Sequence, residues 1–178
     1  MNTFQPVVRN IEITDLPRVL EINNANTPGV SELTFTELET DLQNSLHALA
    51  IDSERGEVCA FCITFDPGAP DAGDNHRWFA ERYKSFVYLD RIAIDSNHQN
   101  LGLGALLYQT VEQHMLNSAK HSLLCCEVNL EPPNPGSLRF HQRIGFTEVG
   151  QHSPQHGYVV SLLLKDTTTQ RNTPLTTT

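Results

Sequence analysis

The chain has 178 residues, of which 39% are hydrophobic and 19% charged, a composition that suits one globular domain. Its formal net charge of −9 argues against nucleic-acid partners and anionic membrane surfaces, because both require clustered Lys and Arg. No apolar run approaches the roughly 18 residues that cross a bilayer, and the start does not resemble a signal peptide, so we expect a soluble, cytoplasmic protein.

The first part of the chain predicts a strand, two helices and a β-hairpin. Asp15 before Leu16 and Pro17 is typical of a helix start, with a capping side chain and proline in the first turn. Apolar residues at helical spacing follow the break at 26–29, and a polar turn with glycine joins the next two apolar runs. The expected elements are a strand over 7–13, helices over 16–24 and 34–45, and strands over 47–52 and 57–65.

The cysteines Cys59 and Cys62 have a C-x-x-C spacing that occurs in zinc and redox sites. They lie in an apolar run with β-strand character, where side chains three residues apart are expected on opposite faces and cannot share one ion. No second pair follows at zinc-finger spacing, and Cys125 and Cys126 occupy another apolar run. We therefore expect four buried thiols and no metal site.

The segment over 66–84 is irregular at first and then aromatic, a composition that long functional loops often have. Its aromatic part contains Trp78, Phe79 and Tyr83, with charged residues between them. These three side chains either wall a substrate pocket or cover an open face of the sheet. A lid over the pocket would satisfy both interpretations.

The second part of the chain alternates strands and helices. A nearly continuous apolar run predicts a central strand, and a glycine-rich turn leads from it into a helix with an apolar stripe. The order of elements indicates a mixed α/β fold in one domain over 1–165, and the threonine-rich residues 166–178 predict a disordered tail. The remaining elements are strands over 85–94, 122–130, 146–151 and 158–164, and helices over 103–119 and 137–144.

The glycine-rich turn, Gln99-Asn100-Leu101-Gly102-Leu103-Gly104, has the properties of an anion site. Amides at a helix start are unpaired, the helix dipole adds positive charge, and glycine lets a phosphate approach the backbone. A Walker loop requires a lysine after Gly104, and a Rossmann loop requires a small residue where Leu107 stands, so both patterns fit badly. Alone, the glycines could equally serve only the turn from strand to helix.

Two motifs around this turn carry a family resemblance. The run from Leu89 to Ile94, followed by Gln99 to Ala105, resembles motif A of the GNAT (GCN5-related) N-acetyltransferases, with its Q/R-x-x-G-x-G/A pattern. The run from Asn134 to Phe146 resembles their N-x-x-S-x-x-F-Y-x-x-x-G-F motif B. The resemblance covers roughly Val7 to Lys165. It implies a mixed, mostly antiparallel central sheet that is splayed at the cofactor site and flanked by helices on both faces.

The resemblance further implies acetyl-CoA as the co-substrate. The backbone of Ile92 and Ile94, with Ala93 between them, would pair with the pantetheine arm as an additional strand. Asn134 stands where the family has an asparagine that contacts the cofactor, and it also suits a helix cap before Pro135. The loop expected to receive the diphosphate consists of Gln99, Asn100, Leu101, Gly102, Leu103, Gly104 and Ala105.

Acetyl transfer to an amine requires a base, and two carboxylates are candidates. Glu127 lies in an apolar strand, where burial would raise its pKa and favour base action. Some family members have a basic glutamate on this strand, but Pro132 and Pro133 lengthen the spacing here, and an ion-paired or exposed glutamate is the alternative. Asp90 could hold an amine or a water, or form a structural ion pair. We expect no contact with Arg91, since strand neighbours face opposite ways.

His141 departs from the family pattern, because many members have at this place the tyrosine that donates a proton to the leaving thiolate. Imidazole titrates near pH 6.5 and can donate a proton, relay it through water, act as a base or contact the cofactor, whereas tyrosine stays protonated to about pH 10. Tyr88, Tyr108 and Tyr158 are alternative donors, although each also suits core packing.

These observations together predict an N-acetyltransferase that moves an acetyl group from acetyl-CoA to a primary amine by direct attack. The motifs do not specify the acceptor, a small molecule or a peptide, and they leave a homodimer open. The main alternative is a non-catalytic acyl-CoA-binding or sensing module that kept motif A. A third interpretation is a nucleotide enzyme that binds ATP or NAD at the glycine loop.

Overall fold

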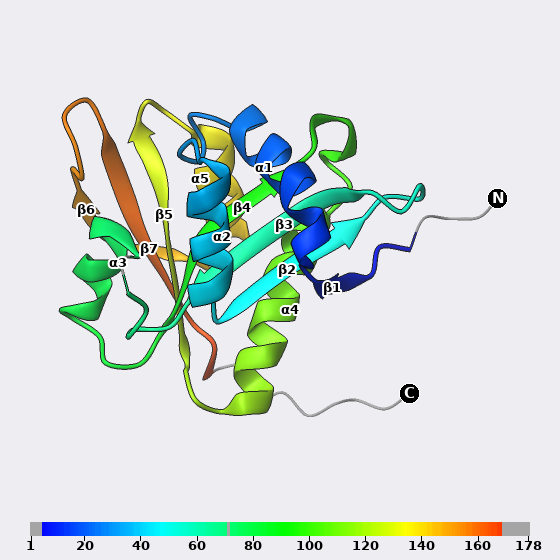
Figure 1. The fold of residues 1–178 in the computed structure, drawn as a ribbon. Coiled ribbons are helices and arrows are strands. Elements are labelled where there is room, and N and C mark those ends of the chain that lie inside the picture. The colour runs from blue at the N-terminus through cyan, green and yellow to red at the C-terminus, as the bar shows by residue number, and fades with distance from the viewer. Residues whose placement is uncertain (1–4, 71, 169–178) are drawn as a thin grey trace.

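Seven strands form one sheet in the computed structural model, which describes residues 5–70 and 72–168 (Figure 1). The strand order is β1-β2-β3-β4-β5-β7-β6, and every neighbouring pair is antiparallel except β4 and β5. This arrangement confirms the mixed, mostly antiparallel sheet that the sequence predicts. The strands are β1 Val8–Asn10, β2 His47–Asp52, β3 Val58–Phe65, β4 Val87–Ile94, β5 Leu123–Glu131, β6 Thr147–His152 and β7 Val159–Asp166.

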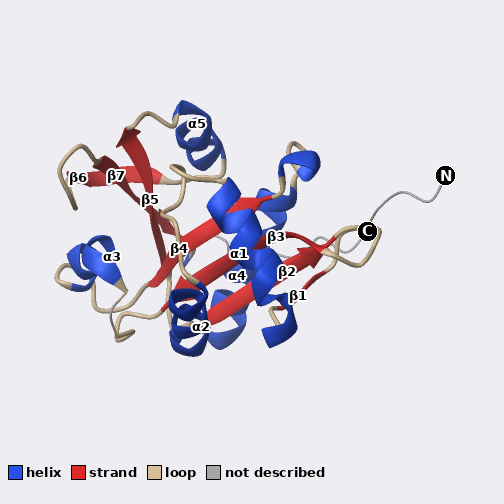
Figure 2. Cartoon of the chain, turned by 45° about the horizontal axis from the view of Figure 1, so that its top comes forward, coloured by secondary structure: helices blue, strands red, loops and turns tan. Residues whose placement is uncertain are grey.

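Helices cover both faces of the sheet (Figure 2). On one face, buried residues of α1 such as Leu16 and Val19 pack with Phe61 of β3. On the other, Leu107 and Val111 of α4 belong to a second apolar cluster. Among the described residues, no helix is long and apolar enough to span a membrane. The helices are α1 Leu16–Ala25, α2 Phe35–Asn44, α3 Gly73–Ala80, α4 Leu103–Ser118 and α5 Pro135–Arg143, with 3₁₀ turns at Ile13–Asp15 and Ser96–His98.

Helix α3 is the element that the sequence did not predict. It has eight residues, and no side chain caps its start, so the usual start signals are missing. Its buried residues His76 and Phe79 are three positions apart, and both rings contact Phe86 and Tyr88. A hydrogen bond of 2.8 Å between His76 Nε2 and the Asp66 carbonyl fixes the helix to the end of β3. Tertiary packing therefore makes this helix, and local propensity does not.

A β-bulge between β2 and β3 changes which side chains share a face. Between β2 and β3, Ala60 pairs with Ile51 and Val58 with Asp52, so Cys59 is an extra residue. Cys59 and Cys62 consequently belong to the same apolar cluster, and the expected opposite-face arrangement is wrong. All four cysteines are nevertheless buried free thiols. The described residues contain no group of His, Cys, Asp or Glu that could hold a metal ion.

The C-terminal segment begins with residues that are part of the fold. Strand β7 includes Asp166, and the buried Thr167 donates through its hydroxyl to the Ser122 carbonyl at 2.9 Å. Residues 169–178, on which the rest of the predicted disordered tail falls, lie outside the described residues.

Three histidines lie close together at the end of the sheet near α4, and we expect them to make the protein less stable in mild acid. The His47 ring lies 4.8 Å from that of His114, and burial, with smaller contributions from His114 and His121, lowers the pKa of His47 to about 4. Because the unfolded pKa is about 6.5, the contribution is complete above that pH and is lost as the pH falls toward 4. We expect a loss of about 1 kcal/mol between pH 7 and pH 5, reduced for the half-exposed ring.

Urea unfolding of the wild type and of His47→Gln at both pH values measures this contribution. The variant should lose less stability than the wild type between pH 7 and pH 5. Equal losses in the two proteins would assign the acid sensitivity to other groups.

Candidate active site

Strands β4 and β5 separate shortly after they meet, and this separation forms the site. Their parallel pairing is limited to Val87 with Leu124 and Tyr88 with Cys125, after which the strands diverge (Figure 1). A cavity of about 740 Å³ lies at this gap. It is lined by parts of 26–32 in the α1–α2 loop, 72–75 at the start of α3, 88–92 in β4, 126–129 in β5, and the β6–β7 loop.

The glycine loop leads from β4 into α4 with an unusual backbone. Asn100 and Gly102 have φ values of 62° and 78°, a left-handed conformation that glycine adopts without strain. Gly102 is the N-cap of α4, and no side chain caps the helix there. The first amides of α4 are therefore available to an anion, which fits a diphosphate.

Glu127 of β5 lies in the cavity next to Tyr88 of β4. The Tyr88 hydroxyl donates a short hydrogen bond to Glu127 Oε2. Burial raises the pKa of Glu127 to about 7, the charge of Asp90 adds to the rise, and hydrogen bonds from Tyr88 and Asn75 oppose it. A carboxylate with this pKa is half ionised at neutral pH and is suited to accept a proton.

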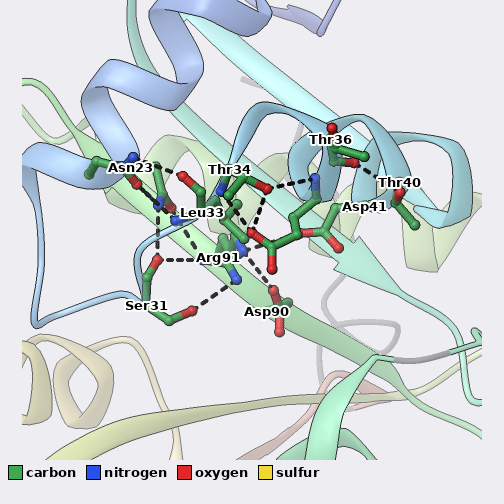
Figure 3. A network of polar contacts seen from close by, with 11 residues as sticks. Asn23, Ser31, Leu33, Thr34, Thr36, Thr40, Asp41, Asp90 and Arg91 are labelled. Carbon is green, nitrogen blue, oxygen red and sulfur yellow. Dashed lines mark hydrogen bonds and ion pairs between the residues drawn. The ribbon is translucent and has the colours of Figure 1, made fainter.

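Asp90 of β4 also lines the cavity, and a β-bulge determines its orientation. Ile63 of β3 pairs with Arg91 and Thr64 with Leu89, so Asp90 is the extra residue of β4. Its Oδ2 lies 3.1 Å from Nε of Arg91 (Figure 3), and our expectation of no contact between these neighbours is wrong. Burial raises the pKa of Asp90 to about 6 although Arg91 opposes the rise.

His141 of α5 is buried and hydrogen-bonded through both ring nitrogens. Nδ1 lies 2.7 Å from the Ser137 carbonyl, which can only accept, so Nδ1 carries the hydrogen. Nε2 is then the acceptor for the Tyr108 hydroxyl at 2.7 Å. Burial lowers the pKa of His141, which favours this neutral form. His141 and Tyr108, both in the cavity lining, therefore form one hydrogen-bonded unit.

This geometry can be compared with known proteins. The family model described as "Acetyltransferase (GNAT) family" matches residues 16–146. The chain belongs to this family. A search of curated proteins gave no match.

Solved structures of other GNAT proteins share the fold. The ribosomal-protein-S18-alanine N-acetyltransferase from Escherichia coli has a TM-score of 0.68 and 18% identity, over 91% of this chain and 94% of that one. NAA60 from Arabidopsis thaliana in complex with a bisubstrate analogue has a TM-score of 0.72 and 12% identity, over 91% and 98%. At such identities the likeness shows the fold alone.

Two residues that the GNAT motifs single out have structural partners. Asn134 caps α5, because its Oδ1 accepts from the Ser137 amide at 3.2 Å. It also lines the cavity, so the capping and cofactor roles are compatible. The Ile94 carbonyl accepts a hydrogen bond of 3.2 Å from Asn26 Nδ2. The α1–α2 loop thus reaches the strand edge to which the resemblance assigns the pantetheine arm.

The aromatic residues of the 66–84 segment pack against the protein. Phe79 is fully buried, and Trp78 and Tyr83 lie against the same apolar cluster. Trp78 also lies so close to β6 that a Cβ at Gly150 would be 2.8 Å from its ring. The part of this segment that lines the cavity is 72–75 at the start of α3.

Arg91 is the important residue that the sequence analysis did not assign. It is 8% exposed, and its guanidinium reaches from β4 to α1, α2 and the loop between them (Figure 3). Nη1 donates to the Ser31 carbonyl at 3.0 Å and to Asn23 Oδ1 at 3.3 Å, and Nη2 donates to Ser31 Oγ at 3.0 Å. Nε lies 3.4 Å from Asp41 Oδ2. Arg91 therefore connects strand β4 to α1, to α2 and to the loop between them, which lines the cavity.

Proposed function

We propose that this GNAT protein transfers an acetyl group from acetyl-CoA to a primary amine by direct attack. The observation that carries the proposal is a partly buried carboxylate, Glu127, whose pKa is raised to about 7, beside the gap between β4 and β5. NAA60 from Arabidopsis thaliana has been solved in complex with acetyl-CoA, in support of the donor.

The donor would occupy the gap and the glycine loop. The uncapped amides at the start of α4 would bind its diphosphate, with Gly102, which has no atom near the place of a Cβ, allowing close approach. The backbone of Ile92 and Ile94 would pair with the pantetheine arm. The Ile94 carbonyl already accepts a hydrogen bond of 3.2 Å from Asn26 Nδ2, and its second lone pair can accept one from the arm.

In the reaction, the amine nitrogen forms a bond to the acetyl carbonyl carbon and the carbon–sulfur bond breaks. Glu127 takes the proton that the amine loses, directly or through a water. The thiolate leaves with the electron pair of the broken bond. A thiol with a pKa of about 8.5 is a tolerable leaving group, so the proton that it finally takes can come from solvent or from Tyr108, a residue of the cavity lining.

Thermal unfolding with ligands and a thiol-release assay test the proposal. Acetyl-CoA should raise the Tm, whereas ATP and NAD at the same concentration should not, because only a ligand that binds the native state stabilises it. A set of amines should then release free thiol from acetyl-CoA. Acetyl-CoA binding without turnover of any amine would support the alternative of a non-catalytic binding module.

A further inference from the structure

We infer that the acceptor is a small amine that carries a second cationic group and no carboxylate. The inference rests on the proposed function and specifies its substrate class. It follows from the carboxylates that line the cavity and from Arg91, the cation among them, whose guanidinium already has hydrogen-bond partners.

Five carboxylates line the cavity, and each comes from a different element of the fold. Two lie on the diverging strands and are partly buried, and a third lies on α2. The other two lie on the α1–α2 loop and at the start of α3, where their side chains are exposed. In chain order they are Glu32, Asp41, Asp74, Asp90 and Glu127.

Arg91 is the one Lys or Arg in the described lining of the cavity, and its guanidinium is already engaged. Nε lies 3.1 Å from Asp90 and 3.4 Å from Asp41, and both terminal nitrogens donate to Ser31. An acceptor carboxylate would compete with these bonds for the guanidinium and would meet the remaining carboxylates. Acceptors with a free carboxylate are therefore disfavoured.

The carboxylates divide between the reacting amine and a second cation. Glu127 and Asp90 lie at the gap between the strands, where the reacting nitrogen must be. Glu32, on the α1–α2 loop, and Asp74, at the start of α3, are both exposed. Asp74 pairs with Arg77 at 3.1 Å, but both side chains are about half exposed or more, so this pair is weak and a ligand cation can replace it.

The three less exposed carboxylates favour a cationic ligand. Burial raises the pKa of Asp41, Asp90 and Glu127, and the charges of neighbouring carboxylates add to each rise. A bound dication would add two positive charges to a lining that has five carboxylates and one arginine, whereas a monoamine would add one.

Three amines of equal chain length test the inference: 1,4-diaminobutane, butylamine and 4-aminobutanoate, with thiol release as the readout. We expect kcat/KM for the diamine to exceed that for butylamine about tenfold or more, the usual effect of one charge-assisted hydrogen bond, with 4-aminobutanoate slowest. The advantage of the diamine should shrink in high salt.

A double variant locates the second cation. Glu32→Gln with Asp74→Asn should lower kcat/KM for the diamine about tenfold and leave that for butylamine nearly unchanged. The control is Glu54→Gln with Glu57→Gln, two exposed residues of the β2–β3 turn, which should change neither rate constant.

The failures of the two proposals are distinguishable. Equal rates for the three amines, preference for 4-aminobutanoate, or turnover of other amines without the diamine would overturn the inference and leave acetyl transfer standing. Acetyl-CoA binding with no amine acetylated at all would overturn the proposed function.

Discussion

Replacing Glu127 by glutamine is expected to lower kcat for acetyl transfer about 10²- to 10⁴-fold, the usual contribution of a positioned general base. Glutamine keeps the size of the side chain and an acceptor for the Tyr88 hydroxyl, but it cannot take a proton. Acetyl-CoA should still bind, since the donor contacts assigned to the glycine loop and β4 do not involve Glu127. Single-turnover thiol release and ligand-dependent Tm values measure the two effects separately.

The pH profile distinguishes a base from a structural carboxylate. Because the pKa of Glu127 is raised to about 7, wild-type kcat/KM should fall below that pH as the carboxylate is protonated. The variant should lack this limb and retain only the dependence that the amine itself imposes. A variant that keeps the limb near pH 7, or that loses less than tenfold in kcat, would remove Glu127 from the base role.

At high pH, Glu127→Gln should lower the activity of the protein without lowering its stability. A carboxyl whose folded pKa is raised above the unfolded value stabilises the fold below the unfolded value of about 4.5, and this contribution is lost as the pH rises toward 7. At pH 8 the wild type therefore carries a buried ionised Glu127 at a cost on the order of 2 kcal/mol. Glu127→Gln should have an equal or higher Tm at pH 8, so a loss of activity would not reflect unfolding.

The sequence predicts the glycine loop better than it predicts the cavity around Asp90 and α3. The residues from Gln99 to Gly104 are consecutive in the sequence, so their motif alone predicts a turn into a helix. In the structure this turn leads into α4, whose start has no side-chain cap. The other half depends on the extra residue Asp90 in β4 and on helix α3, which tertiary packing stabilises. No sequence pattern predicts the bulge at Asp90. Because of it, Asp90 and Arg91 are in contact, whereas regular strand geometry predicts that they face opposite ways.

Tyr108 and His141 illustrate the same limit. Motif B identified His141 as a departure from the family, but its partner is 33 positions away on another helix. Only the fold shows that the Tyr108 hydroxyl and the imidazole form one unit that reaches the cavity. Pairings between distant elements do not follow from local periodicity.

Replacing Arg91 by methionine is expected to lower the free energy of unfolding by about 3–5 kcal/mol at pH 8, the usual result of removing one partner from buried charges. Asp41 and Asp90 would keep their burial, with side chains 25% and 18% exposed, and lose their cation. Ser31 and Asn23 would lose their donors, so the α1–α2 wall should loosen as well. Urea unfolding measures the loss of stability.

The dependence of this loss on pH and on a second substitution tests its cause. Without Arg91 the pKa values of Asp41 and Asp90 should rise further, so the destabilisation should be largest above about pH 6 and should shrink in acid as both carboxyls take up protons. Adding Asp41→Asn to Arg91→Met should recover part of the loss, and Arg91→Lys, which keeps the charge without the fork of donors, should lose less. An equal loss at pH 5 and pH 8 would mean that Arg91 acts by packing.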